Sequence, residues 1–221
     1  MKSNESRRPL KVRQLGLIQD LASWMSRKNI SPNQISLASV GFAFLASLCL
    51  FQFPSADDWL VWTYPLLAAV FIQCRLLCNL FDGMVAVEGK KGTASGELFN
   101  DIPDRIADPL ILVSAGYAVI AFDYAVALGW AAGLLAVMTA YIRVLAVSIG
   151  APADFSGPMA KQHRMAVMTG LLVVTALPLP WAADGFVLYL GLIVIVVGEI
   201  VTVGRRCRAA SLALEKPGGS E

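Results

Sequence analysis

The chain has 221 residues, of which 57% are apolar and only 15% are charged, and its formal net charge is +2. In an average soluble domain about a quarter of the residues are charged, so this composition predicts an integral membrane protein. The small net charge, carried by basic residues that are spread over short hydrophilic segments, excludes a nucleic-acid-binding protein.

The cysteines give no sign of a disulfide framework, because they lie in or beside apolar segments without pairing spacings. Cys74 and Cys78 are four residues apart. A zinc site needs more ligands, however, and the only histidine, His163, is distant in the sequence. Helix packing accounts better for the four cysteines, Cys49, Cys74, Cys78 and Cys207.

The N-terminal residues 1–30 are predicted to form a cytoplasmic segment with a surface helix. Residues 1–10 are charged and irregular. Between Lys11 and Lys28 apolar residues recur at steps of three and four, and Trp24 is placed as an interfacial anchor. The pattern predicts an amphipathic helix on the membrane surface. The alternative is an amphipathic helix packed against other parts of the protein.

Six membrane spans are expected within residues 31–205. Ser31 is placed to cap the first helix, and Pro32 suits its first helical position. The apolar segments have lengths near the roughly 20 residues that cross the hydrocarbon core. The expected spans are 35–53, 59–87, 96–120, 124–149, 164–179 and 185–203, followed by a cytoplasmic tail at 206–221.

The basic residues predict the orientation of these spans, because Lys and Arg favour the cytoplasmic side. They gather in the N-terminal segment, in the loop with Lys90 and Lys91, in the segment with Lys161 and Arg164, and in the tail. The opposite turns, near residues 57–58, 123 and 180–184, carry none. We therefore expect a multi-pass protein of the inner membrane with both termini and its polar cluster in the cytoplasm.

Polar side chains gather on both sides of a glycine-containing loop at residues 88–95. Helical spacing places Arg75, Asn79 and Asp82 on one face of the second span. A second polar face in the third span consists of Glu97, Asn100, Asp101, Asp104 and Asp108. Ionisable groups at membrane depth are costly and mark functional sites. Carboxylate and amide oxygens brought together in this way suit a hard divalent cation, which commonly holds phosphates.

Each of these residues also has a structural alternative. Asn100 is suited to cap a helix whose first turn contains Pro103. Asp82 is spaced to pair with Arg75, and Arg105 is spaced to pair with Asp101 or Asp108. The joint occurrence of these residues at helical spacings nevertheless favours a functional site.

The same block carries a family resemblance. It reads Asn79-x-x-Asp82-Gly83-x-x-Ala86-Val87, then eight residues, then Gly96-x-x-x-Asn100-x-x-x-Asp104. This resembles the signature D-x-x-D-G-x-x-A-R, eight residues, G-x-x-x-D-x-x-x-D of the CDP-alcohol phosphatidyltransferase family. The resemblance covers most of the chain, from the surface helix through the Pro32-Asn33 element to the six spans.

The resemblance implies an all-α integral membrane enzyme with six transmembrane helices preceded by an amphipathic interfacial helix. Such an enzyme moves a phosphatidyl group from a CDP-linked lipid donor, such as CDP-diacylglycerol, to a polar alcohol acceptor and releases CMP. The resemblance further implies a homodimer in phospholipid biosynthesis, with Mg2+ or Mn2+ as its cofactor.

Residue roles are implied at the matching positions. Asp104 and Asp82 are expected to be catalytic, with Asp104 as the general base for the acceptor hydroxyl. The implied metal ligands are Asn79, Asp82, Asn100 and Asp104. The expected substrate contacts are Asn33, Arg75, Gly83, Ala86, Thr93, Gly96, Arg143, Lys161 and Arg164. The small residues among them would let a helix backbone or a nucleotide approach closely.

Three positions depart from the signature. Asn79 and Asn100 replace aspartates, which keeps carbonyl oxygens but removes two negative charges and predicts weaker cation binding. Val87 replaces the signature arginine. Because these groups are missing, replacements are expected nearby: a positive charge from Arg75 or Lys90, and an anionic ligand from Asp101 or Glu97.

Downstream basic residues are expected to line the acceptor pocket. Arg143 lies in an otherwise apolar span, and Lys161 and Arg164 lie in the next polar segment. A phosphorylated acceptor would need such groups. The alternative for Lys161 and Arg164 is contact with lipid headgroups on the cytoplasmic side.

Two other functions are compatible with the sequence. One is a catalytically weakened homologue that binds CDP-lipid or metal as a partner or regulatory protein, which the departures at Asn79, Asn100 and Val87 favour. The other is a small transporter with an intramembrane ion site. A transporter predicts polar residues near the middle of the bilayer, whereas these are expected at its cytoplasmic edge.

Overall fold

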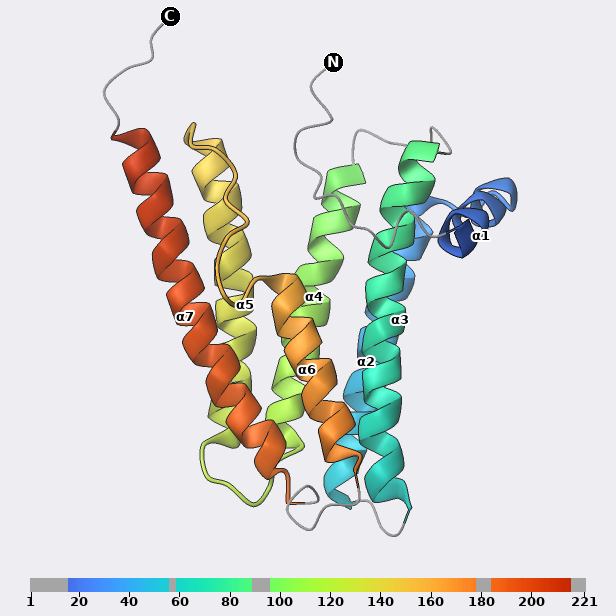
Figure 1. Cartoon of the computed structure of the whole chain (residues 1–221), viewed down its shortest axis with the longest axis vertical. Helices are drawn as coiled ribbons and strands as arrows, with labels where there is room; N and C mark the ends of the chain where they lie inside the picture. Colours follow the sequence, from blue (N-terminus) through green and yellow to red (C-terminus); the bar gives the residue numbers. More distant parts are fainter. Residues whose placement is uncertain (1–15, 56–58, 89–95, 178–183, 216–221) are drawn as a thin grey trace, which may run out of the picture.

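The structure, a computed structural model, describes residues 16–55, 59–88, 96–177 and 184–215. Within these ranges it is all-α, and helices α2 to α7 form an elongated bundle with α1 across one end (Figure 1). The elements are α1 (Gly16–Arg27), α2 (Pro32–Gln52), the 3-10 helix η2 (Phe53–Ser55), α3 (Leu60–Glu88), α4 (Gly96–Tyr117), α5 (Ala125–Ser148), α6 (Lys161–Thr175) and α7 (Phe186–Leu214).

The start of α2 confirms the predicted cap. The Ser31 hydroxyl accepts a hydrogen bond from the backbone N–H of Gln34 at 3.2 Å, and the Gln34 side-chain oxygen accepts from the backbone N–H of Ser31 at 2.9 Å. Pro32 follows at the first helical position. This reciprocal arrangement satisfies two N–H groups that a helix start leaves free. Local sequence therefore fixes where the bundle begins.

Each of the six expected spans overlaps one helix of the bundle. By length and composition, α2, α3, α5 and α7 are apolar and long enough to cross a membrane. The other two differ: α4 carries most of the charged residues of the polar block, and α6 has only 15 residues. The apolar helices support a multi-pass membrane protein, while crossing by all six remains a prediction.

The short α6 is placed differently from its predicted span, which covered residues 164–179. It begins about halfway along the bundle, after residues 149–160 run back beside α5 and α7 (Figure 1). At about 1.5 Å per residue, 15 residues span roughly 22 Å, less than the roughly 30 Å of the hydrocarbon core. The N-terminus of α6 therefore lies inside the bundle. In contrast, α7 extends to Leu214, beyond its predicted end at residue 203.

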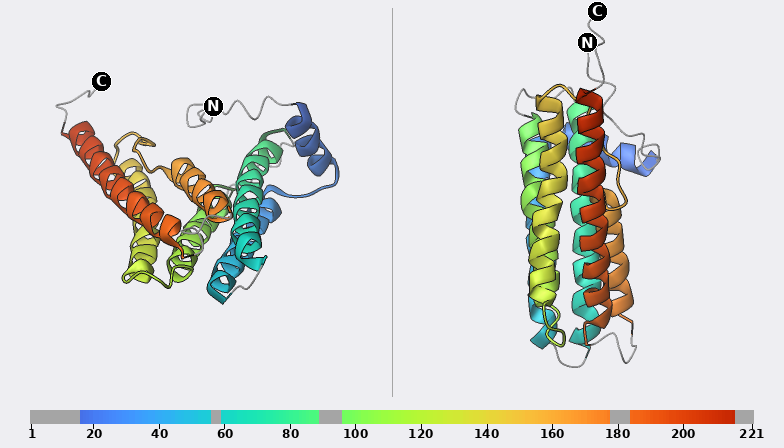
Figure 2. Two further views of the ribbon diagram at one scale, coloured as in Figure 1. Left: turned by 60° about the horizontal axis from the view of Figure 1, so that its bottom comes forward. Right: turned by 90° about the vertical axis from the view of Figure 1, so that its left-hand side faces the viewer.

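The bundle is assembled from a few helix pairs that run along a common axis (Figure 2). α2 packs against α3 and α4, α5 packs against α4 and α7, and α6 packs against α3 and α7. The closest approach of α4 and α5 is at Gly116 and Gly129, where a Cβ added to either would lie 3.0 Å from the other's Cα. The apolar core includes Ile72, Ile111, Leu112, Met165, Met168, Leu172, Leu188, Leu192 and Ile195.

Helix α1 lies crosswise to the bundle and packs against the end of α3 (Figure 2). Ala22 is fully buried, and with Ile18 and Met25 it contacts an apolar cluster that includes Leu80, Phe81, Met84 and Val85 of α3. Leu21 and Trp24 remain exposed. One face of α1 therefore packs against other parts of the protein, as the alternative interpretation expected. Contact of the other face with the membrane remains a prediction. Residues 11–15 of the predicted helix lie outside the described residues.

Candidate functional site

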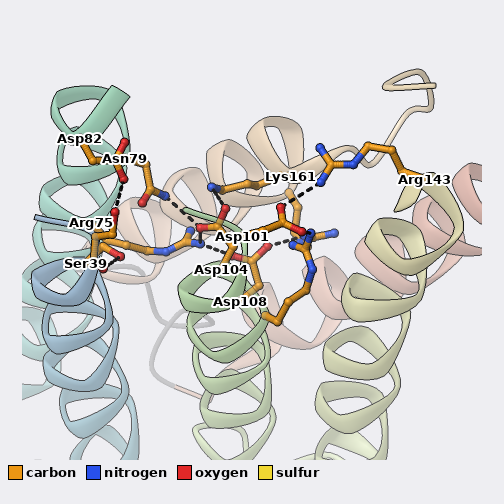
Figure 3. A network of polar contacts seen from close by, with 12 residues as sticks. Ser39, Arg75, Asn79, Asp82, Asp101, Asp104, Asp108, Arg143 and Lys161 are labelled. Carbon is orange, nitrogen blue, oxygen red and sulfur yellow. Dashed lines mark hydrogen bonds and ion pairs between the residues drawn. The ribbon is translucent and has the colours of Figure 1, made fainter. Parts of the chain in front are cut away.

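Asp104 on α4 is the meeting point of two other helices (Figure 3). Its Oδ1 accepts hydrogen bonds from Nη2 of Arg75 at 2.9 Å and from Nδ2 of Asn79 at 3.0 Å, both on α3. Its Oδ2 accepts from Nζ of Lys161, the first residue of α6. The first and last positions of the signature, Asn79 and Asp104, are therefore in direct contact across two helices.

From Asp104 the contacts continue through the bundle as a chain of ion pairs. Nη2 of Arg75 lies 2.5 Å from Oδ1 of Asp108, whose Oδ2 pairs with Arg164. Nη1 of Arg164 lies 2.7 Å from Oε1 of Glu199 on α7. We call this the buried ion network; it contains three positive and three negative side chains, Arg75, Lys161, Arg164, Asp104, Asp108 and Glu199.

Burial divides the buried ion network into a closed part and an accessible end. Arg75 and Glu199 are fully buried, and Asp108 and Arg164 are nearly so. The Lys161 side chain is 32% exposed. Among the described residues, Nε and Nη1 of Arg75 and Oε2 of Glu199 have no hydrogen-bond partner, although they are buried. Such groups are costly, so only complete charge pairing makes this arrangement tolerable. Lys161 is therefore the accessible end of the network.

Asp82 lies beside the buried ion network but uses a different partner. Its Oδ2 accepts a hydrogen bond of 2.7 Å from the hydroxyl of Ser36 on α2. Arg75 instead pairs with Asp104 and Asp108, so the structural alternative of an Asp82–Arg75 pair is wrong. Asp82 and Asp104 are 4% and 7% exposed, so neither faces the outside of the bundle.

Gly83, the residue after Asp82, has open space around it. A Cβ added at Gly83 would meet no atom within 4 Å. Close helix packing therefore does not explain this glycine, unlike Gly116 and Gly129. The open side of α3 next to Asp82 offers room for a bound molecule.

A second group of charges lies on the side of α4 that faces α5. Asp101 pairs with Arg105 one turn along the same helix at 2.6 Å, which confirms that predicted pair. It also pairs with Arg143 of α5 at 2.9 Å. The Arg143 guanidinium lies 5.1 Å from the centre of the Phe155 ring. The side chains of Asp101 and Arg143 are 40% and 25% exposed, so this group is open to solvent or ligand.

The remaining predicted residues lie at the edges of the site or outside the described part. Asn100 is exposed on α4, and because α4 begins a full turn earlier, its interpretation as a helix cap is wrong. Asn33 is half-buried in the first turn of α2, Ala86 is half-buried near the end of α3, and Gly96 is the first residue of α4. Thr93, Lys90 and the side chain of Glu97 lie outside what the structure describes.

Sequence reasoning missed two participants. Glu199 had a signal, because a lone acidic residue inside an apolar span marks a buried partner or site. Ser36 had none, because its hydrogen bond to Asp82 depends on how α2 packs against α3. Asp108 was part of the polar block and a possible partner of Arg105, but it pairs with Arg75 and Arg164 instead.

Comparison with known proteins gives distant relatives. No protein-family model matches the chain. A phosphatidylinositol phosphate synthase of Mycolicibacterium smegmatis is 25% identical over 213 residues, covering 93% of this chain and 87% of that protein. An uncharacterised protein of Aquifex aeolicus is 26% identical over 201 residues, covering 90% and 91%. The inner membrane protein YnbA of Escherichia coli is 24% identical over 160 residues, covering 70% and 72%.

Solved structures resemble the whole chain. The crystal structure of Mycobacterium tuberculosis phosphatidylinositol phosphate synthase, PgsA1, with CDP-DAG bound has a TM-score of 0.74 at 19% identity and covers 94% of this chain and 98% of that one. Its complex with manganese and citrate also has a TM-score of 0.74, at 20% identity with 92% of both chains covered. The chain therefore has the fold of this synthase.

Proposed function

We propose that the chain is an inner-membrane CDP-alcohol phosphatidyltransferase, which transfers a phosphatidyl group from a CDP-linked lipid donor such as CDP-diacylglycerol to a polar alcohol. The synthase relatives, the shared fold and the retained signature residues support this proposal. The observation that carries it is the hydrogen bond between Asn79 and Asp104, because it brings the two halves of the signature together. The further proposals are a homodimer and a site that opens to the cytoplasm.

In the proposed reaction the acceptor hydroxyl attacks the phosphorus that carries the lipid. The new bond joins the acceptor oxygen to that phosphorus, the bond from phosphorus to CMP breaks, and CMP leaves. Asp104 accepts the hydroxyl proton, and Lys161 beside it contacts the phosphates. Positioning and electrostatic stabilisation account for most of the acceleration in phosphoryl transfer, which suits a site built from fixed charges.

The proposed substrate positions follow from exposure. The open side of Gly83 next to Asp82 receives the CDP part of the donor, with Ala86, Gly96, Thr93 and Asn33 as the other expected contacts. Arg143 is accessible and faces the acceptor. Arg164 is closed off by Asp108 and Glu199, so its proposed role is to hold the buried ion network and not to contact the acceptor.

A divalent cation requires a separate test against the residues present. The manganese complex of the M. tuberculosis synthase supports divalent metal use in this fold, and Mg2+ or Mn2+ stays a prediction for this chain. The arrangement around Asp104 does not fit the implied ligand set, because both of its oxygens accept from nitrogen donors. Among the described residues no cluster of three or more His, Cys, Asp or Glu is placed to hold a metal. The roles given above therefore use side chains alone.

The proposal predicts CMP release by the purified protein. Protein in detergent or liposomes would be mixed with CDP-diacylglycerol and, one at a time, glycerol phosphate, inositol phosphate and serine, with and without divalent cation. We expect release that depends on one acceptor. It should fall by at least about a hundredfold in Asp104→Asn, because general bases commonly contribute that much or more. Release that is equal in the wild type and Asp104→Asn would reject Asp104 as the base.

The weakened homologue is the second candidate function. The amides at Asn79 and Asn100 favour it, as does the pairing of Asp104 with Arg75 and Lys161. It predicts saturable binding of CDP-diacylglycerol without CMP release for any acceptor. The same acceptor screen, combined with a binding measurement, separates the two functions.

A further inference from the structure

Asp104 is surrounded by nitrogen donors where a metal ligand would face a cation (Figure 3). Two ligands of one cation turn oxygens towards it. Asn79 instead turns its amide nitrogen to Asp104, at 3.0 Å, as the donor of a hydrogen bond. Asn79 and Asp104 are therefore a donor and acceptor pair, and not two ligands of a shared ion.

Arg75 is the fixed part of this arrangement. It is fully buried, and its Nη2 lies 2.9 Å from Asp104 and 2.5 Å from Asp108. A guanidinium is not deprotonated in proteins, so Arg75 is a permanent positive charge between two carboxylates. Lys161 contacts the other oxygen of Asp104 from the accessible side.

The charge balance agrees with this geometry. A centre of four aspartates carries four negative charges and requires added cations to hold a pyrophosphate. Here Asn79 and Asn100 remove two of those charges, and the buried ion network, which does not include the neighbouring Asp82, has as many positive as negative side chains. A divalent cation placed at Asp104 would meet repulsion from Arg75 and Lys161 in a partly buried setting, where such repulsion is strong.

We propose that Arg75 and Lys161 take the place of a divalent metal at Asp104. Arg75 holds the carboxylate from the buried side, and the ammonium group of Lys161 pairs with the phosphates of the bound donor. The catalytic meaning of this exchange rests on the proposed function. The expected low affinity for metal at Asp104 does not depend on the proposed function, because metal binding can be measured without turnover.

The test is Mn2+ binding by the purified full chain in detergent, followed by the electron paramagnetic resonance signal of free Mn2+. Two variants each remove one cation from Asp104: Lys161→Met, and Arg75→Leu combined with Asp108→Asn. The second of these keeps the buried charges balanced and so protects folding. We expect Lys161→Met to bind Mn2+ at least about tenfold more tightly than the wild type, because a repelling cation is removed. The double variant should also bind Mn2+ more tightly, but with a smaller gain, because the attracting carboxylate of Asp108 is lost together with Arg75. The matched control is Arg105→Leu, which removes an arginine paired with a different aspartate of α4 and should leave the affinity unchanged.

Two results would overturn the proposal. The first is that the wild type binds Mn2+ as tightly as both variants do, and that this binding is lost in Asp104→Asn. The second is CMP release that EDTA abolishes and Mn2+ restores in the wild type. Release that persists in EDTA would support the proposal. Failure to release CMP under any condition would reject the proposed function alone, because the Mn2+ comparison among the variants still decides this inference.

Discussion

At the scale of single residues, the structure separates side chains that the sequence pattern groups together. Arg75, Asn79 and Asp82 share one helical face of α3, yet the first two contact Asp104 of α4 and the third contacts Ser36 of α2. Spacing along a helix predicts a common face, but partners depend on the neighbouring helix at each height. The two aspartates expected to be catalytic are therefore held by different helices.

Gly83 provides a residue-scale prediction. Gly83→Leu should fill the open space beside Asp82 and weaken binding of CDP-diacylglycerol by at least about tenfold, because a 1.4 kcal/mol clash already has that effect. The thermal unfolding temperature should stay nearly unchanged, since no atom lies within 4 Å of the added Cβ. Binding would be measured by titration in detergent.

Gly170→Leu is the matched control for this prediction. Gly170 on α6 is also free of neighbours at its Cβ, but it is not adjacent to Asp82. Its substitution should leave both binding and unfolding unchanged. Equal binding by the wild type and Gly83→Leu would show that the donor does not use this side of α3.

At the scale of elements, the position of α6 decides the depth of the site. Residues 149–160 return along the bundle, so α6 begins halfway down and its first turn carries Lys161 and Arg164 to α4 and α7 (Figure 1). An ordinary loop at the end of the bundle would have left these residues at its edge. The N-terminal turn of α6 therefore lies within the bundle and not at its end.

The contact of α4 with α5 provides an element-scale prediction. Gly129→Ala should destabilise the protein by about 1–3 kcal/mol, because overpacking in a tight contact costs that much. Its Cβ would lie 2.9 Å from the backbone oxygen of Leu112 and 3.0 Å from the Cα of Gly116. Gly41→Ala, in α2 with no neighbour within 4 Å, should be neutral or stabilising, because alanine favours helix.

Thermal unfolding in a single detergent would measure both substitutions. A lower unfolding temperature for Gly129→Ala than for Gly41→Ala is the expected order. The reverse order would mean that α4 and α5 do not approach each other at the two glycines.

At the scale of the whole molecule, the buried ion network connects α3, α4, α6 and α7. Alternating charges run from Lys161 through Asp104, Arg75, Asp108 and Arg164 to Glu199. Buried ions are tolerated when each has a partner of opposite charge, and removing one partner is far more costly than removing a pair. The network therefore favours this particular arrangement of helices over others with the same apolar contacts.

Glu199 provides the prediction at this scale. Glu199→Leu should destabilise the protein by about 3–5 kcal/mol, because Arg164 then loses one of its two buried partners. Arg164→Met combined with Glu199→Leu should cost less than Glu199→Leu alone, since it leaves Asp108 paired with Arg75 and restores charge balance. Chemical unfolding in mixed micelles would measure both. A double variant less stable than Glu199→Leu alone would contradict the expected coupling.

The sequence by itself predicted the class of protein, the approximate positions of the helices and the location of the candidate site along the chain. Composition predicted a membrane protein, Ser31 and Pro32 predicted the start of α2, and the spacing of polar residues identified the block around Asp104. These features are local, because hydrophobic periodicity, caps and spacing act within one helix.

Only the tertiary structure decided which charges meet. Three features depend on helices that are far apart in the sequence. They are the pairing of Asp104 with Arg75 and Lys161, the hydrogen bond from Ser36 to Asp82, and the burial of Glu199. Lys and Arg side chains are long and can reach any nearby carboxylate, so spacing along one helix cannot select among partners on three others. The start of α6 inside the bundle made that selection, because it brought two more positive charges to the carboxylates of α4.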